Sequence, residues 1–170
     1  GLESIEVSAE APALNLNCGA GDFSPTQTWT FEQASKSQHM LLRNLTPSPP
    51  GTLVGAALDG DGDRCLVLQA TRDGFMVVDG DAIGDTILST AALYSKAPWH
   101  LAASIESDLS LLATAGRLPA PVKTSETAVG DRWLSKALGD ALPNSETPPR
   151  SLGVEDSGHT VMPTPLPGKT

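Results

Sequence analysis

Three aspartates at alternate positions carry the clearest chemical signal in the sequence. Asp59, Asp61 and Asp63 are separated by single glycines in the stretch DGDGDR, which Arg64 ends. Apolar runs precede and follow the stretch, so it is expected to be a turn between two strands. Carboxylates held this close repel one another unless a cation lies among them, and the glycines let the backbone turn tightly. The run therefore predicts a divalent-cation site, with a solvated acidic turn as the alternative.

The oxygen ligands and the room for waters or a phosphate oxygen suit Mg²⁺. An EF-hand also begins with alternating aspartates, but it needs glycine at its sixth position and glutamate at its twelfth. Arg64 and Ala70 stand there instead, which leaves a calcium-binding acidic protein as a minor alternative. Arg64 is expected to orient an aspartate from behind, to bind a phosphate, or simply to pair with its acidic neighbours.

A second cluster of polar residues follows a predicted strand in GVEDSGH, residues 153–159. Glu155 could accept hydrogen bonds from sugar hydroxyls, and Ser157 could donate or accept one. His159 could contact a phosphate or hydroxyl, or move a proton. Loops at the carboxyl ends of strands in an open α/β sheet are where ligands bind. The alternative is a polar turn with a surface histidine.

The segment VKTSETAVGDRW, residues 122–133, carries a weaker signal. Lys123 and Arg132 could contact a phosphate, whereas Thr124 or Thr127 would cap the following helix. The two other histidines, at positions 39 and 100, are expected to be structural or surface groups.

These residues must be positioned by strands and helices that alternate along the chain. Strands are expected at 13–18, 52–58, 65–70, 75–78, 100–105, 120–124 and 151–155, the second of them buried. Helices are expected at 27–43, 79–96, 107–115 and 127–142, the third capped by Ser107 and the second by Asp79 or Asp81. A hairpin turn is expected at 72–74. The alternation predicts an α/β fold with a mostly parallel sheet and a domain junction near 78–80.

Composition narrows the choice of partners. The net charge of −9 in 170 residues argues against nucleic acid, because phosphate backbones require clustered lysine and arginine. No apolar run is long enough for a membrane span, and the first residues do not resemble a signal peptide. The two cysteines form no disulfide framework, so a cytoplasmic protein with reduced thiols is expected.

Four segments together resemble the α-D-phosphohexomutases in residue type, order and spacing. They are DGDGDR, VVDGDAI, TAVGDRWLSKAL and GVEDSGH, and LNLNCGAGD resembles the first strand and turn of that family's second domain. The family includes phosphoglucomutase/phosphomannomutase and phosphoglucosamine mutase. The resemblance spans most of residues 13–163.

The resemblance implies two consecutive α/β/α domains with mixed, mostly parallel sheets, from a family that has four domains around a central cleft. Residues 1–79 would be a shortened second domain with the metal loop, and residues 80–170 a third domain with the sugar loop. The expected site residues are Asp59, Asp61 and Asp63 for Mg²⁺, Arg64 and His159 for catalysis, and Glu155, Ser157, His159 and Lys123 for the substrate.

The implied reaction interconverts hexose 1-phosphate and 6-phosphate through a phosphoserine and a bisphosphorylated sugar. The family's serine loop and its last phosphate loop, in domains one and four, do not occur in this sequence. The chain alone is therefore expected to be inactive and to need those missing domains. Phosphoglucosamine mutase, and a non-catalytic module that binds metal and sugar phosphate, remain alternatives.

Overall fold

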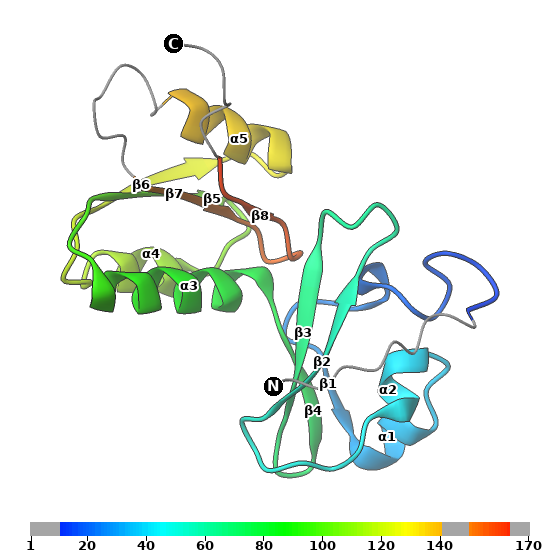
Figure 1. Ribbon diagram of the computed structural model, residues 1–170. Helices are drawn as coiled ribbons and strands as arrows, with labels where there is room; N and C mark the ends of the chain where they lie inside the picture. The colour runs from blue at the N-terminus through cyan, green and yellow to red at the C-terminus, as the bar shows by residue number, and fades with distance from the viewer. Residues whose placement is uncertain (1–10, 141–149, 164–170) are drawn as a thin grey trace. The chain divides into compact units, whose positions relative to one another are not determined.

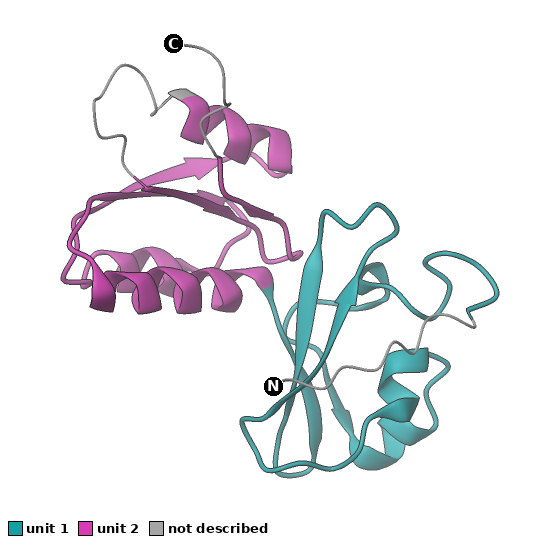
Figure 2. Cartoon of the chain, in the orientation of Figure 1, with its two compact units in different colours: residues 1–79 teal, residues 80–170 magenta. Residues whose placement is uncertain are grey.

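The computed structural model describes residues 11–140, apart from the side chain of Asp140, and residues 150–163. The chain divides into unit 1, Gly1–Asp79, and unit 2, Gly80–Thr170, which Figure 2 colours separately. The division falls where strand gives way to helix. β4 ends at Val78 and α3 begins at Gly80.

Unit 1 is built on a four-stranded sheet in which every pairing is antiparallel. Its strands are β1 (Thr28–Thr30), β2 (Leu53–Leu58), β3 (Cys65–Ala70) and β4 (Gly74–Val78), in the spatial order β1-β4-β3-β2. Two tight connections, at 59–64 and 71–73, join β2 to β3 and β3 to β4, and such hairpins produce antiparallel neighbours. The expected mostly parallel arrangement therefore does not hold in unit 1.

Short helices cover one face of the unit 1 sheet. They are the 3₁₀ helix η1 (Ala20–Asp22), α1 (Phe31–Ser35) and α2 (Met40–Asn44). Ala34 of α1 and Leu42 of α2 join Leu68, Phe75 and other strand residues in one buried apolar cluster. Packing of small helical side chains on β-strand side chains gives this unit its own core.

Unit 2 contains the expected parallel sheet. Its strands are β5 (Trp99–Ser104), β6 (Val122–Thr127), β7 (Arg150–Val154) and β8 (Thr160–Val161), in the spatial order β6-β5-β7-β8. β5 pairs in parallel with β6 and β7, and only the short β8 runs antiparallel, beside β7. The carboxyl ends of β5, β6 and β7 therefore lie at one edge of the sheet.

Helices cover both faces of the unit 2 sheet, as Figure 1 shows. α3 (Gly80–Tyr94) and α4 (Leu109–Ala115) lie on one face and α5 (Asp131–Asp140) on the other. Leu88, Leu101 and Leu152 belong to the apolar cluster under α3 and α4, and Leu134 and Leu138 pack on Ala102 under α5. Every residue of β5 is buried, because this strand is central. This three-layer unit confirms the α/β/α prediction.

Several local predictions are wrong, each for a physical reason. Residues 13–18 form turns rather than a strand, since Asn15 and Asn17 adopt positive φ angles of 58° and 56°, which asparagine tolerates. The segment 27–43 holds one short strand and two short helices in place of one helix. β2 is an edge strand rather than a buried one, with Leu53 63% and Leu58 57% exposed.

In the part of the chain that the structure describes, no helix has both the length and the apolar character needed to traverse a bilayer.

Candidate functional site

The acidic loop, residues 59–64, is the tip of the hairpin between β2 and β3. The last ladder pair joins Leu58 to Cys65, and the Asp59 N–H then donates to the Arg64 carbonyl across 3.4 Å. The Gly62 N–H donates to the Asp59 carbonyl across 3.2 Å, with a Gly62 φ of +75°. This left-handed conformation favours glycine, and it allows the loop to reverse within a few residues.

Asp59 is the fixed member of the loop. Its side chain is only 4% exposed, and its two carboxylate oxygens accept from the Arg64 backbone N–H at 3.2 Å and the Arg64 Nε–H at 2.7 Å. Burial alone raises the pKa of Asp59, but the hydrogen bonds and charge of Arg64 outweigh it and hold that pKa at about 2. Asp59 is therefore ionised across the physiological pH range.

The other two aspartates of the loop complete a possible cation site. One carboxylate oxygen from each of Asp59, Asp61 and Asp63 lies within 4.8 Å of the others, and Asp61 and Asp63 are exposed. Ligands bind Mg²⁺ at about 2.1 Å, so oxygens on opposite sides of the ion are separated by roughly 4 Å. The three oxygens thus need only a small contraction to become ligands, and the donor set fits Mg²⁺.

A second segment of unit 1 supports the acidic loop. Gly19 and Gly60 both contact Asn15, and a Cβ built on Gly60 would lie 2.4 Å from the Asn15 Nδ2. The place of a Gly21 side chain is likewise within 3.8 Å of the Arg64 guanidinium. The segment LNLNCGAGD therefore packs against the acidic loop and Arg64, although it is not a strand.

The second candidate loop, Glu155–His159, connects β7 to β8 in unit 2. The Glu155 N–H donates to the His159 carbonyl across 3.1 Å, and the Gly158 N–H donates to the Glu155 carbonyl across 3.0 Å. Gly158 has a φ of +103°, a value that L side chains rarely adopt. These two backbone bonds close the loop and direct three polar side chains to one point.

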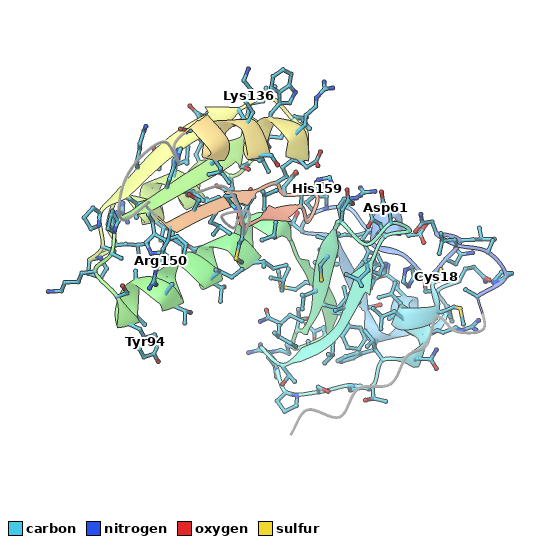
Figure 3. All side chains as sticks on the ribbon, turned by 45° about the horizontal axis from the view of Figure 1, so that its top comes forward. Cys18, Asp61, Tyr94, Lys136, Arg150 and His159 are labelled. Atoms are coloured by element: carbon cyan, nitrogen blue, oxygen red, sulfur yellow. The ribbon has the colours of Figure 1, made fainter. Side chains whose placement is uncertain are left out.

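Those side chains form a network around the Glu155 carboxylate. Oε2 of Glu155 lies 2.7 Å from Nδ1 of His159 and accepts from the Ser157 hydroxyl at 3.4 Å. The Ser157 hydroxyl is also 3.2 Å from the same His159 nitrogen. Glu155 is 2% exposed, whereas the His159 side chain is 17% exposed. Figure 3 shows His159 on this loop and Asp61 on the acidic loop of unit 1.

The start of α3 packs directly against this loop. The Gly80 N–H donates to the Asp156 carbonyl across 3.1 Å, and a Cβ on Gly80 would overlap the Glu155 carbonyl at 1.8 Å. Asp81, one residue on, is buried and accepts from the Asp108 N–H at 2.7 Å. Asp81 thus joins α3 to the loop that follows β5. Asp108, rather than the expected Ser107, caps α4.

The loop between β6 and α5 provides the remaining contact. The Gly130 N–H donates to Oε1 of Glu155 across 2.5 Å, and Gly130 has a φ of +121°. Sequence reasoning missed Gly80, Asp81 and Gly130 as supports of the site. The only available signal was that glycine or aspartate opens the helical pattern in VVDGDAI and TAVGDRW.

Lys123 is not brought to the Glu155–His159 loop. It is the second residue of β6, in register with His100 of β5 and thereby with Ser151 of β7. Glu155 lies four residues beyond Ser151, a distance of about 13 Å along an extended strand. Arg132 lies in the first turn of α5, with its guanidinium 5.0 Å from the centre of the Trp133 ring.

The remaining histidines are buried structural groups. Nδ1 of His39 accepts from the Leu41 N–H at 3.2 Å and so caps α2, and burial lowers the pKa of this histidine. Nε2 of His100 lies 2.8 Å from the Ser125 hydroxyl, and burial and the charge of Lys123 lower the pKa of His100. His100 lies on the central strand β5.

Comparisons with known proteins point to one family. The chain is 33% identical to the phosphoglucosamine mutase of Mycolicibacterium smegmatis over 165 residues, which are 96% of this chain and 30% of that protein. The phosphoglucosamine mutase of a Nocardioides species is 30% identical over 168 residues, again 30% of its length. A solved N-acetylglucosamine-phosphate mutase of the α-D-phosphohexomutase superfamily shares the fold, with a TM-score of 0.57 at 18% identity.

Along 96% of its length the chain is similar to a phosphoglucosamine mutase, and it shares its fold with a solved member of the α-D-phosphohexomutase superfamily. The chain spans about 30% of the length of the relatives it matches, and it covers 26% of the solved apo structure, which in turn covers 87% of it. An Aspergillus fumigatus N-acetylphosphoglucosamine mutase, solved with glucose 1,6-bisphosphate, aligns with a TM-score of 0.50 at 19% identity. No protein-family model matches the chain.

Proposed function

We propose that this chain is the part of a phosphohexomutase that carries its metal loop and its sugar loop. Unit 1 would be the second domain of the enzyme and unit 2 the third. The observation that best supports the proposal is that both loops have an ordered arrangement of polar side chains. Three carboxylates converge within 4.8 Å on one, and a closed Glu-Ser-His network stands on the other. Both occur in a chain that matches phosphoglucosamine mutases along 96% of its length.

In the acidic loop, Asp59, Asp61 and Asp63 would hold Mg²⁺. When bound, Mg²⁺ would offset negative charge on the oxygens of a phosphoryl group during its transfer. Arg64 keeps the Asp59 carboxylate ionised and fixed through its two hydrogen bonds. Its guanidinium, about one third exposed, is proposed to attract a phosphate oxygen from the same position.

In the sugar loop, His159 and Ser157 are proposed to meet the hydroxyls or the phosphate of a sugar phosphate. Both are half-buried at the carboxyl end of β7, where open α/β sheets bind ligands. The phosphoryl group itself would come from a phosphoserine on another domain of the same enzyme, pass to the sugar and return from its other end. The chain by itself is therefore proposed to be inactive.

Glucosamine phosphate is the substrate favoured for the whole enzyme. The observation behind this choice is that the matched relatives from Mycolicibacterium and Nocardioides are phosphoglucosamine mutases. A hexose phosphate of the phosphomannomutase or phosphoglucomutase type is the second candidate. The two thiols, Cys18 and Cys65, are both free, which is consistent with the cytoplasmic location we propose.

The decisive experiment is an assay of the full-length parent with glucosamine, glucose and mannose phosphates. Isomerisation of glucosamine 6-phosphate and 1-phosphate that depends on Mg²⁺ and on glucose or glucosamine bisphosphate is expected. Isomerisation of mannose or glucose phosphates alone would favour the second candidate. Saturable binding of sugar phosphate without any turnover would replace the proposal with a non-catalytic binding module.

A further inference from the structure

His100 is a buried histidine on the central strand of unit 2, and the function proposed above does not use it. The residue is 2% exposed, and Nε2 lies 2.8 Å from the Ser125 hydroxyl of β6. The other ring nitrogen, Nδ1, is buried and has no hydrogen-bond partner in the described part of the chain. A buried polar atom without a partner costs free energy, so burial and one contact hold this ring in place.

The ring of His100 points toward α5. Side chains alternate along a strand, so His100 shares a face with Ala102, on which α5 packs. On this face β6 places Lys123 in register with His100, and β7 places the uncharged Ser151 at the same level. β8 contributes no charged residue. The charged residues of α5 are Asp131, Arg132, Lys136 and Asp140.

The surroundings of His100 disfavour a positive ring. The cations of α5 lie over the Trp133 ring, and Arg150 of β7 lies over the Trp99 ring. Among the described residues no carboxylate forms an ion pair with His100. Burial, and then the charge of Lys123, lower the pKa of His100. A proton on the ring would therefore be a buried charge without a counter-ion.

The contact between His100 and Ser125 joins the central strand to an edge strand. β6 is the outer strand of the order β6-β5-β7-β8, and in the described sheet it pairs with β5 alone. The Trp99 N–H donates to the Pro121 carbonyl at 2.8 Å and the Ile105 N–H to the Thr127 carbonyl at 2.9 Å. A strand with one neighbour opens at a lower free energy than a central strand. A change at His100 should therefore release β6 first.

β6 also leads directly to the loop before α5. It ends at Thr127, three residues before Gly130, whose N–H donates to Oε1 of Glu155. A displacement of β6 would therefore move one partner of this hydrogen bond. His100 and the loop after β7 are thus connected through a single strand.

We propose that His100 is a pH-sensitive switch for β6: its neutral ring holds β6 on β5 through Ser125, and protonation releases β6 together with the Gly130 contact to Glu155. Because the folded-state pKa is lowered from 6.5, the switch stabilises the sheet above about pH 6.5, and that stability is lost as the pH falls below it. An effect on sugar phosphate binding rests on the function proposed above, whereas the release of β6 does not.

Amide hydrogen exchange of the chain tests the switch at about pH 7.5 and at about pH 5.5, on either side of the ordinary histidine pKa. The Trp99 and Ile105 amides report the pairing of β5 with β6, and protection is measured relative to an unstructured peptide at the same pH. An opened state with an ordinary histidine gains up to about tenfold in population over this range. Protection of both amides, and of the Gly130 amide, should fall by about three- to tenfold.

The variant His100→Gln should remove this pH dependence. Glutamine does not titrate, and its amide can still form a hydrogen bond with the Ser125 hydroxyl. His39→Gln is the matched control, because His39 is likewise buried, with a pKa that burial lowers, but lies in unit 1. That control should show the same fall at Trp99 and Ile105 as the native chain.

Equal protection at both pH values in the native chain overturns the proposal, as does an undiminished fall in His100→Gln. A fall that spares Gly130 also contradicts it, because the release would not reach the loop before α5. An equal fall at the Arg150 amide, which donates to the Pro98 carbonyl, would show that the whole unit opens rather than β6.

If His100→Gln does not fold, carbon-13 NMR of the native His100 ring decides. A ring that stays neutral until the Trp99 and Ile105 amides lose protection supports the switch. A ring that titrates near its ordinary pKa while both amides stay protected contradicts it. A parent enzyme without mutase activity would leave these results standing and would refute only the proposed function.

Discussion

The two candidate loops differ in what holds them together. The acidic loop of unit 1 buries the Asp59 carboxylate against Arg64, whereas Asp61 and Asp63 are exposed. The loop of unit 2 buries Glu155, whose carboxylate contacts Ser157 and His159 of the same loop and accepts the Gly130 N–H. The first loop brings three carboxylates close together beside one guanidinium, whereas the second surrounds a single buried carboxylate with hydrogen-bonding groups.

This contrast indicates different states before ligand binding. In the proposed function, a bound cation would relieve charge repulsion in the acidic loop, so the loop would gain order from the ion. The Glu155–His159 loop is organised in advance, and the organising energy comes from folding of unit 2. Substitutions should therefore affect ion binding in the first loop, and use of the phosphosugar or stability in the second.

The largest expected effect is from Asp61→Asn in the full-length parent. This exposed residue has no structural anchor to lose, so the fold should be unchanged while Mg²⁺ affinity and turnover fall by about 10²-fold or more. Asp73→Asn is the matched control, an exposed aspartate in the other hairpin turn of the same sheet. The metal assignment is refuted if both variants keep full turnover at limiting Mg²⁺.

His159→Ala in the full-length parent should have the second largest effect. Loss of an imidazole that accepts a proton or a hydrogen bond should reduce kcat/KM for the phosphosugar by roughly 10²-fold. Mg²⁺ binding measured by calorimetry should stay the same, because the proposed ligands are in unit 1. A change confined to the thermal unfolding curve, with normal kinetics, would show that the histidine is merely structural.

Gly80→Ala should destabilise unit 2 by about 1–3 kcal/mol or more, because its Cβ would overlap the Glu155 carbonyl at 1.8 Å. Urea unfolding followed through the NMR signals of β5 measures this. Gly139→Ala is the control in another helix, with nothing within 4 Å of its Cβ position. That variant should raise stability by roughly 0.5–1 kcal/mol. Equal effects of the two changes would contradict the close packing at Gly80.

The smallest effect is the acid sensitivity of unit 1. Because the folded-state pKa of Asp59 is about 2 rather than 3.8, its ionised form stabilises the fold above about pH 4, and that contribution is lost as the pH falls toward 2. Asp59→Asn should flatten the fall in stability over this window, as followed by urea unfolding at each pH. Asp73→Asn should leave the fall in stability with pH unchanged. If Asp73→Asn flattened it equally, the interaction of Asp59 with Arg64 would not explain the acid sensitivity.

Much of the framework can be predicted from local patterns. Residues 65–70 form a strand, as their apolar run between turn signals predicts, and Gly116 ends α4 as expected, because both depend on nearest neighbours in sequence. Residues 13–18 alternate apolar and polar side chains and still form turns. The positive φ of Asn15 and Asn17 accompanies packing of Asn15 against Gly60, a contact that no local pattern encodes.

In the candidate site, too, some features are predictable from local sequence and others depend on long-range contacts. The residue types and spacing in DGDGDR and GVEDSGH identify both loops, since ligand chemistry is legible in the residues themselves. The residues that pack against the second loop cannot be identified from the sequence alone. Gly80 and Gly130 are glycines like the others in the sequence until the fold places Glu155 against each of them. Lys123 carries the right charge for a phosphate, but its register in β6 leaves it at the other end of the strand.

The most direct test of the account is a titration of the chain with Mn²⁺, a paramagnetic substitute for Mg²⁺, followed by amide NMR. The amides of residues 59–64 should broaden first and saturably, excess Mg²⁺ should restore them, and Asp61→Asn should abolish the effect. Broadening that spreads evenly over exposed acidic residues such as Asp73 and Glu32, or that Mg²⁺ fails to reverse, would contradict a cation site among Asp59, Asp61 and Asp63.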